Sequence, residues 1–367
     1  MRYRPLLPCA LALGIAWVAA CGDSSTEPTQ PSEPTPSGTE LAAATNTWIT
    51  RANLPTTRRG LDLATVTNAA GQSVVYAIGG ATDVYPVTTL RKVTAYNVAT
   101  NTWNDRRQLP VPLVESNGAG VINGKIYISG GSDPGNGLVT KALYVYDPAT
   151  NTWTRKRDLP TIAGPGRDWR VGGGGVTGVI ENQLYVVTLC RTINYSEYGC
   201  EGDLTGPRLF RYNPVTDRWV TLAPPFPRAK GGPSTSEVWT LAGGVIGGKF
   251  YVMGGDFGNN GRLSVYNPAT NRWTPKTPLG LSRWGVATAV LGNRLYVMGG
   301  YRNRDNRFET LDITIVYDPV TNLWTRRASL PSPRGNIAGT TVLRDGKPRI
   351  EVVGGAPASR NNLQYIP

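Results

Sequence analysis

The stretch Leu143–Pro160, LYVYDPATNTWTRKRDLP, decides the fold because the chain repeats it. Alternating apolar residues mark a first strand, and Asp147-Pro148 opens a turn, because Asp caps the backbone locally and Pro presets φ. Asn151 tolerates the left-handed conformation at the end of the turn, and Trp153 begins the next strand. The similar stretches are Val93–Pro110, Leu209–Pro225, Leu263–Gly280 and Thr314–Pro331. Each predicts a β-hairpin.

A second repeated block precedes each hairpin. It reads IYISGG at Ile126–Gly131, FYVMGG at Phe250–Gly255 and LYVMGG at Leu295–Gly300, with variants at Val75–Gly80 and Ile350–Gly355. Paired glycines allow close backbone approach and unusual dihedral angles where a strand must stop sharply. One full unit is therefore expected to hold four strands, with Gly-Gly ending the second and Trp opening the fourth.

The order of double glycine, Tyr and Trp resembles the kelch repeat. The repeat tryptophans are Trp48, Trp103, Trp153, Trp219, Trp273 and Trp324, and their spacings of 55, 50, 66, 54 and 51 residues are close to the kelch period of about 50. The resemblance covers residues 45–367. It implies a β-propeller in which each repeat is one radial blade and the blades stack around an axis.

The two ends of the repeat array predict how the ring closes. Trp48 has no Gly-Gly strand before it, and Gly354-Gly355 has no Trp after it. The N-terminal segment around Trp48 is therefore expected to supply the fourth strand of the last blade, which removes the open edge of a linear array. We predict an all-β, six-bladed kelch-type β-propeller with four antiparallel strands per blade.

The N-terminal residues 1–44 carry targeting signals instead of repeats. Arg2 and Arg4 precede an apolar run, Leu6–Val18, that is too short to span a membrane. Val18–Cys21 looks like a bacterial lipobox, which implies that residues 1–21 are a lipoprotein signal and that Cys21 is lipidated; an ordinary signal peptide or a short anchor is the alternative. Gly22 at the next position favours the outer membrane. Residues 22–44, rich in Pro, Ser, Thr and Glu, are expected to form a disordered tether.

The remaining cysteines and the absence of histidine limit the chemistry. Cys190 and Cys200 are expected to form a disulfide because export places them in an oxidising compartment; two free thiols are the alternative. The sequence has no CxxC spacing and no histidine, which argues against a zinc site, a Ser-His-Asp triad and the copper site of the galactose oxidase branch of kelch propellers. We expect no metal and no cofactor.

The resemblance implies that the loops between blades and the loops after Gly-Gly gather at one mouth of the channel. Aromatic faces suit sugar rings, and guanidinium groups bind carboxylates or phosphates. The residues of these loops expected to bind a ligand are Trp169, Trp239, Trp284, Arg59, Arg170, Arg283, Arg302 and Arg334. In the alternative interpretation the tryptophans pack between blades and the arginines form a solvated rim.

The charge balance favours an acidic partner. The formal net charge is +13, and loss of Arg2 and Arg4 with the signal leaves +11. We therefore expect a monomeric binding module for an acidic glycan or an envelope protein, held at the membrane by its lipid; no nucleic-acid motif is present. The alternative is a carbohydrate-active enzyme of epimerase, lyase or hydrolase type that uses carboxylates. The carboxylates expected near the mouth are Asp62, Glu115, Asp168, Glu237 and Asp256, and their spacing selects no pair.

Overall fold

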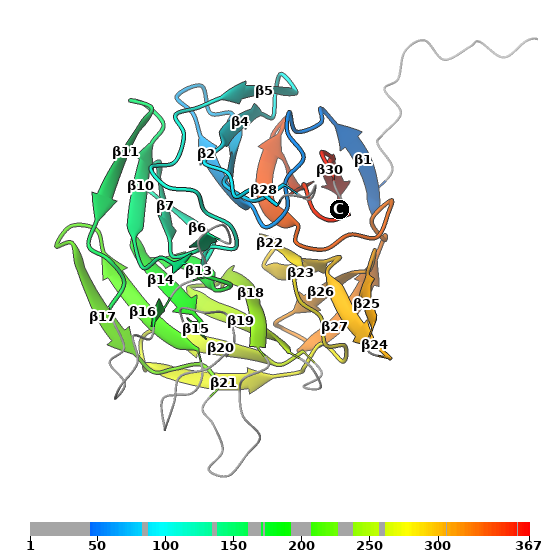
Figure 1. The fold of residues 1–367 in the computed structure, drawn as a ribbon. Coiled ribbons are helices and arrows are strands. Elements are labelled where there is room, and N and C mark those ends of the chain that lie inside the picture. The colour runs from blue at the N-terminus through cyan, green and yellow to red at the C-terminus, as the bar shows by residue number, and fades with distance from the viewer. Residues whose placement is uncertain are drawn as a thin grey trace, which may run out of the picture. The chain divides into compact units, whose positions relative to one another are not determined.

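The computed structural model describes a ring of six four-stranded antiparallel sheets, a six-bladed β-propeller (Figure 1). The described residues are 45–82, 87–133, 138–160, 170–171, 173–191, 207–226, 238–256, 261–305, 307–357 and 359–367. The ring lies within the compact unit Ala43–Pro367. Among the described residues, no helix is long and apolar enough to cross a membrane. The prediction of an all-β propeller with six blades is confirmed.

Each blade runs from an inner strand beside the axis to an outer strand at the rim. Blade one is β2 (Asp62–Thr67), β3 (Ser73–Ile78), β4 (Val93–Asn97) and β5 (Thr102–Asp105); blade two is β6 (Ala119–Ile122), β7 (Lys125–Ser129), β10 (Leu143–Asp147) and β11 (Thr152–Lys156); blade three is β13 (Val176–Ile180), β14 (Gln183–Thr188), β16 (Arg208–Asn213) and β17 (Arg218–Leu222). Blade four is β18 (Val238–Ile246), β19 (Lys249–Asp256), β20 (Leu263–Asn267) and β21 (Arg272–Lys276); blade five is β22 (Ala287–Leu291), β23 (Arg294–Met298), β26 (Thr314–Asp318) and β27 (Leu323–Arg327).

Blade six is assembled from both ends of the repeat array. It contains β28 (Ala338–Arg344), β29 (Lys347–Val353), β30 (Asn362–Ile366) and β1 (Thr47–Arg51), and β1 pairs antiparallel with β30, placing Trp48 opposite Tyr365. In Figure 1 the blue β1 lies beside the dark red β30. The predicted closure of the last blade by the N-terminal strand is confirmed.

Three short hairpin-like pairs extend from the blades. They are β8 (Ser132–Asp133) with β9 (Leu138–Val139), β12 (Arg170–Val171) with β15 (Cys190–Arg191), and β24 (Tyr301–Arg304) with β25 (Arg307–Thr310). β8, β15 and β24 each follow the end of a second strand, so these pairs belong to the loops that the sequence places at one mouth.

The recurring Tyr, Asn and Trp form a hydrogen-bonded link between neighbouring blades. In blade two the Tyr146 hydroxyl donates to Asn151 Oδ1 over 2.6 Å, and the same oxygen accepts the N–H of Arg107 from blade one over 2.9 Å. Trp153 Nε1 donates to the Arg107 carbonyl over 3.0 Å. Asn151 makes these bonds at φ 54°, in the left-handed region. The motif therefore recurs because every blade needs this link to its neighbour.

The same link is present at all six junctions, including the closing one. The equivalent tyrosine pairs are Tyr96–Asn101, Tyr212–Asp217, Tyr266–Asn271, Tyr317–Asn322 and Tyr365–Asn46. At closure Asn46 also accepts the N–H of Ala328 over 2.9 Å, and Trp48 Nε1 donates to the Ala328 carbonyl over 2.8 Å. Residues from the two ends of the array thus complete one and the same motif.

The paired glycines end the second strands as predicted in blades one, two, five and six. Gly79 and Gly80 have φ 63° and 91°, and a Cβ added to Gly79 would lie 2.4 Å from the Leu113 carbonyl oxygen. Blade four differs, because Gly254 and Gly255 continue β19 alongside a lengthened β18. The double glycine therefore brings the chain close to the loop between blades where the second strand ends.

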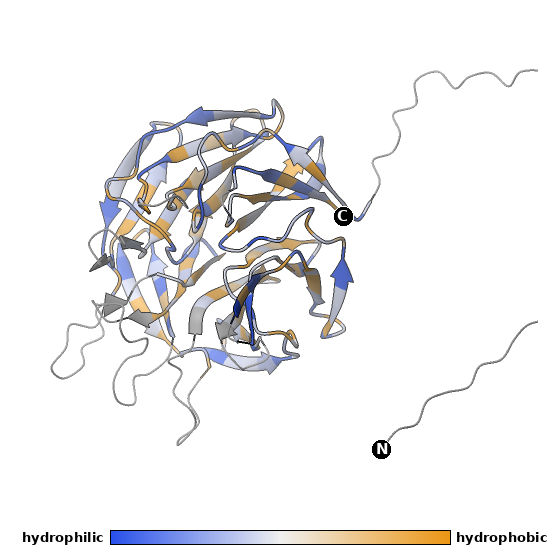
Figure 2. Ribbon diagram, turned by 45° about the vertical axis from the view of Figure 1, so that its right-hand side comes forward, coloured by the Kyte–Doolittle hydropathy of each residue, from blue (hydrophilic) through white to orange (hydrophobic). Residues whose placement is uncertain are grey.

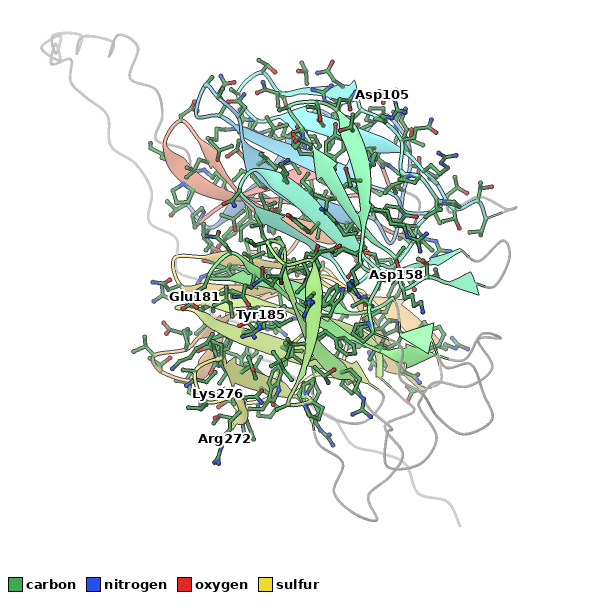
Figure 3. The ribbon with its side chains drawn as sticks, turned by 90° about the vertical axis from the view of Figure 1, so that its left-hand side faces the viewer. Asp105, Asp158, Glu181, Tyr185, Arg272 and Lys276 are labelled. Carbon is green, nitrogen blue, oxygen red and sulfur yellow. The ribbon has the colours of Figure 1, made fainter. Side chains whose placement is uncertain are left out.

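A pair of tyrosines fills five of the six seams between blades. The tyrosine of each second strand packs against the third-strand tyrosine of the next blade, with ring centroids 5.6–6.2 Å apart: Tyr76–Tyr146, Tyr127–Tyr212, Tyr185–Tyr266, Tyr251–Tyr317 and Tyr296–Tyr365. Outer strands are mainly hydrophilic and partly exposed (Figures 2 and 3), so the buried apolar surface lies in these seams.

In the sixth seam a buried polar network replaces the tyrosine pair, beside an apolar cluster that includes Leu63, Val75, Val342 and Val353. Glu351 on β29 takes the place of the second-strand tyrosine, and it is fully buried near Tyr96 of blade one. Gln364 Nε2 donates to Glu351 Oε1 over 2.5 Å, and Arg51 Nη2 donates to Gln364 Oε1 over 2.6 Å. Arg344 donates to the Tyr96 hydroxyl over 3.1 Å. The seam that closes the ring is therefore held by a buried polar network.

Candidate functional site

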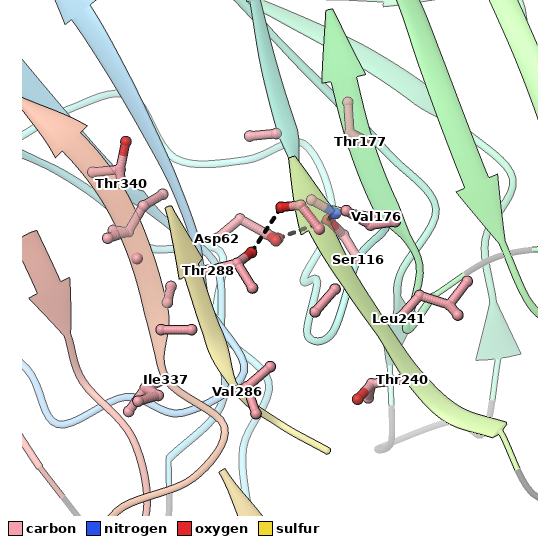
Figure 4. Close-up of a pocket in the computed structure, with 18 of the residues that line it drawn as sticks. Asp62, Ser116, Val176, Thr177, Thr240, Leu241, Val286, Thr288, Ile337 and Thr340 are labelled. Carbon is pink, nitrogen blue, oxygen red and sulfur yellow. Dashed lines mark hydrogen bonds between the residues drawn. The ribbon is translucent and has the colours of Figure 1, made fainter. Parts of the chain in front are cut away.

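The inner strands surround an axial cavity of about 310 Å³ (Figure 4). Small residues line much of it because the strands converge there; a Cβ added to Gly244, for example, would lie 2.5 Å from Val290 Cγ2 of the next blade. Hydroxyl groups supply most of its polar side chains: Ser116, Thr177, Thr240, Thr288, Thr340 and Thr341. Four of these hydroxyl groups, those of Ser116, Thr177, Thr288 and Thr341, donate their hydrogen within the protein, so the wall mainly offers acceptors to the hydroxyl groups of a ligand.

Backbone hydrogen bonds tie together the loops at the mouth of this cavity. The Gly60 N–H donates to the Asn336 carbonyl over 2.9 Å, and the Glu115 N–H donates to the Gly60 carbonyl over 2.9 Å. Gly174 then donates to Glu115 over 2.8 Å, and Leu241 donates to Gly174 over 2.7 Å. The chain of bonds passes from blade to blade, so the rim of the cavity is a connected and preorganised structure.

Two acidic residues predicted near the mouth lie together on the cavity wall. Asp62 opens β2, and Ser116 Oγ donates to its Oδ2 over 2.6 Å (Figure 4). Burial, with a smaller contribution from the nearby Glu115 charge, raises the pKa of Asp62 to about 6, and the Ser116 hydrogen bond acts in the opposite direction. Glu115 has φ 49°, a left-handed conformation that is unusual for a residue other than glycine. Asp62 is thus a carboxyl group that can exchange a proton near neutral pH.

The arginines predicted to bind a ligand occupy different environments. Arg283 is 1% exposed and donates to the carbonyls of Val297, Gly299 and Ile313 over 3.1–3.4 Å. Its guanidinium therefore holds the loop against its own blade. Arg302 pairs with Glu309 across β24 and β25 at 2.7 Å.

Two further arginines from the predicted set lie beside the loop between blades six and one. Arg59 exchanges backbone hydrogen bonds with Ala81 over 3.0 and 2.9 Å. Arg334 is 3% exposed and lines a separate pocket of about 340 Å³.

Aromatic side chains gather at the β24–β25 pair, and one of them, Tyr301, lies next to the wall of the axial cavity. Trp284 is 7% exposed and stacks on Tyr301 with centroids 5.9 Å apart, while Phe308 meets the Trp284 ring edge-on at 5.3 Å. Phe308 itself is 62% exposed. Tyr301 reaches the cavity rim, since a Cβ added to Gly285 would lie 3.2 Å from its Cδ2. The buried Trp284 ring packs against Tyr301 and Phe308, and Phe308 is the exposed ring of this aromatic surface.

Sequence reasoning named Trp284 and missed Phe308. The segment 301–310 reads as a polar loop after Gly-Gly, and Phe308 is its single apolar side chain between charged residues. That isolated Phe between Arg307 and Glu309 is the signal that marks a hairpin with one face against Trp284.

Several predicted residues lie outside the described part of the chain. Trp169, Asp168, Glu237, Cys21 and Cys200 are among these, and for Trp239, Arg170, Cys190 and Asp256 only the backbone is described. The predicted disulfide and lipidation therefore stay predictions. Within the described residues, no three His, Cys, Asp or Glu side chains gather into a group that could hold a metal ion.

Comparisons with known proteins agree with the geometry. A model of the kelch motif matches residues 116–160, 241–280 and 283–331. A Kelch-like protein, terF of Aspergillus terreus, is 29% identical over 267 residues, which are 71% of this chain and 54% of that protein. These matches support the kelch-repeat propeller family. The chain spans about half the length of the curated relative that it matches.

A solved structure shares the architecture of this β-propeller. The structure of YjhT superposes with a TM-score of 0.61, covering 84% of this chain and 94% of that chain at 15% sequence identity. At that identity the likeness concerns the fold alone.

Proposed function

We propose that this kelch propeller is an exported, lipid-anchored binding module that takes an acidic glycan at the mouth of its axial cavity. The observation that carries the proposal is the combination of a hydroxyl-lined cavity of about 310 Å³ with the aromatic cluster of Trp284, Tyr301 and Phe308, whose Tyr301 ring lies next to Gly285 of the cavity wall. A sugar ring has an apolar face that packs on an aromatic ring and hydroxyl groups that hydrogen-bond to serine and threonine.

The ligand class follows from the charge of the chain. The net charge, +13 for the full sequence and +11 once Arg2 and Arg4 are removed with the signal, attracts acidic polymers and raises their rate of association. Within this field the cavity supplies shape and hydrogen bonds. An envelope protein that contacts the rim is the other partner that fits a basic propeller, and the experiment below separates the two.

The test is a binding titration of the purified full-length protein with trigalacturonate and its methyl ester. We expect Phe308→Ala to weaken binding of trigalacturonate by about fivefold, because loss of aromatic stacking removes about 1 kcal/mol. Val320→Ala is the matched control, since Val320 is 91% exposed in the turn between β26 and β27. Unchanged affinity in Phe308→Ala would contradict the glycan site. Binding of neither sugar would leave an envelope protein as the partner.

Membrane attachment has its own test. We expect Cys21→Ala to move the protein from the membrane fraction to the soluble fraction of the producing cell, because the change removes the proposed lipid attachment. The fractionation of the unchanged protein is the control. Equal membrane retention of both proteins would contradict lipidation at Cys21.

A second candidate function is catalysis of a proton transfer on a bound sugar. Asp62 favours it, because this carboxyl group on the cavity wall has a pKa raised to about 6 by burial and receives a hydrogen bond from Ser116. In that case Asp62→Asn should abolish turnover of an acidic sugar while leaving its binding largely unchanged. Binding without turnover in the unaltered protein would favour the binding module.

A further inference from the structure

We propose that a second pocket, formed by the loops before, within and after blade six, binds an oxyanion through the hydroxyl groups of Ser332 and Ser359, which Arg334 holds, and through Arg360. The pocket has a volume of about 340 Å³ and is lined by Asn53, Thr57, Ser332, Pro333, Arg334, Pro357, Ser359, Arg360 and Asn361. It shares no lining residue with the axial cavity. The proposal therefore goes beyond the glycan site and does not depend on it.

An internal comparison shows what is special about Arg334. Arg58, Arg283 and Arg334 hold the same position in their loops, each one residue before the backbone bridge to the post-glycine segment. Arg58 donates to the carbonyls of Ala77, Gly79 and Lys92, each over 3.2 Å, as Arg283 does to the equivalent carbonyls of blade five. Both guanidinium groups are thus used to hold a Gly-Gly turn.

Arg334 makes a different set of contacts. It donates to the Ser332 carbonyl over 3.3 Å, to the Ser332 hydroxyl, and to the Ser359 hydroxyl over 3.2 Å. The Asn361 amide oxygen accepts from it over 3.1 and 3.3 Å when the amide is turned to satisfy both groups. These acceptors belong to Ser332, Ser359 and Asn361, which all line the pocket. The guanidinium is therefore part of the pocket wall.

The partners of Arg334 are neutral, although the residue is only 3% exposed, and their five hydrogen bonds use all five N–H groups of the guanidinium, so Arg334 contributes its positive charge and holds the two serines. A buried charge that is hydrogen-bonded only to neutral groups retains much of its desolvation cost, and a bound anion offsets that cost. Ser332 and Ser359 accept hydrogen bonds from Arg334, which leaves their hydroxyl hydrogens to donate to a ligand. The wall is therefore arranged to receive a negatively charged acceptor.

Arg360 adds a second positive charge at the entrance. Its side chain is exposed, and its carbonyl accepts the N–H of Leu54 over 2.7 Å, which fixes its backbone beside the pocket. Thr57 and Asn53 add polar groups from the segment between blades six and one. One buried and one exposed guanidinium suit a carboxylate, sulfate or phosphate group.

The experiment is calorimetric titration of the full-length protein with D-glucuronate and with inorganic phosphate, using uncharged D-glucose as the control ligand. We expect at least one of the two anions to bind, glucose not to bind, and affinity to fall with added salt. Arg334→Gln should weaken binding about tenfold and Arg360→Ala about threefold. Arg272→Ala is the matched control, because Arg272 is exposed on the outer strand β21 (Figure 3).

The arms of this experiment identify the source of the oxyanion. Preference for glucuronate indicates an acidic sugar; preference for phosphate, together with binding to phosphatidylglycerol vesicles, indicates a lipid headgroup. If the unaltered protein binds neither anion at millimolar concentration, the proposal is wrong. It is equally wrong if Arg360→Ala, whose exposed site preserves the fold, binds as the unaltered protein does. Phe308→Ala should leave anion binding unchanged, which separates this site from the glycan site.

Discussion

The hydrogen bonds of Asn151 explain why the hairpin motif recurs in every blade. Its Oδ1 accepts from Tyr146 and from the backbone of Arg107 in the neighbouring blade, and its backbone is left-handed. We expect Asn151→Ala to lower the free energy of unfolding by roughly 2 kcal/mol, because it removes both hydrogen bonds and disfavours the turn. Denaturant titration measures this loss.

Blade three supplies the control for that prediction. Asp217 stands at the equivalent position, accepts from Tyr212 over 2.6 Å and from the Arg157 N–H over 3.0 Å, and has φ 52°. Asn151→Asp should therefore cost less than about 1 kcal/mol. If the Ala and Asp variants lose the same free energy of unfolding, the Oδ1 acceptor is not what this position requires.

Glu351 makes the closing seam sensitive to pH. Burial raises its pKa to about 7, while Gln364, Arg344 and Arg51 act to lower it. Tyr96 of blade one faces the same network. Between its unfolded pKa of 4.5 and its folded pKa of about 7, the folded protein holds more protons, so stability is greatest at low pH and is lost as pH rises through 7.

The matched variant for this effect is Glu351→Gln, which keeps the shape and removes the titration. We expect the unaltered protein to lose roughly 2 to 3 kcal/mol more than the variant between pH 5 and pH 8. Urea unfolding at the two pH values measures the difference, and the titration of Asp62 cancels because both proteins carry it. Identical pH dependence would mean that Glu351 does not titrate in this range.

Among the elements, β1 tests how the ring is closed. It pairs with β30, and Trp48 bonds to Ala328 of blade five. A chain that begins at residue 52 should melt roughly 10 °C below one that begins at residue 45, because an edge strand and the Trp48 link are lost together. Equal midpoints in a thermal scan would show that the N-terminal strand adds nothing to closure.

The blades were predictable because each element carries its own local signal. The tyrosine and tryptophan alternate with polar residues, Asn151 marks the turn, and the unmatched Trp48 reveals the shared blade. Glu351 was also visible as the exception to the second-strand tyrosine. Its role was not, because burial beside Gln364 and Tyr96 depends on strands that are far apart in the sequence.

The site was predictable only in part, because a sequence gives the position of a loop residue and not the direction of its side chain. Arg283 and Arg334 occupy equivalent positions, yet one bonds to the carbonyls of its own blade and the other lines a pocket. Trp284 does lie at the predicted loop, but it supports Tyr301 and leaves Phe308 as the exposed ring.

At the scale of the whole molecule, six similar links produce one ring with chemically distinct faces. The outer hairpins carry exposed turns, whereas the loops between blades are joined by the hydrogen bonds of Gly60, Glu115 and Gly174 around the cavity. A preorganised rim loses little conformational entropy on binding, which favours recognition of a ligand at this mouth.

The most direct test of ligand binding at the mouth is hydrogen–deuterium exchange of the full-length protein with and without saturating trigalacturonate. Bound ligand should slow exchange in segments 60–66, 115–121, 285–290, 301–310 and 336–341, which contain the cavity wall and the aromatic hairpin. Segments 97–105 and 147–156 in the outer hairpins should exchange at the same rate in both samples. Slower exchange confined to those outer segments would contradict a ligand site at the mouth.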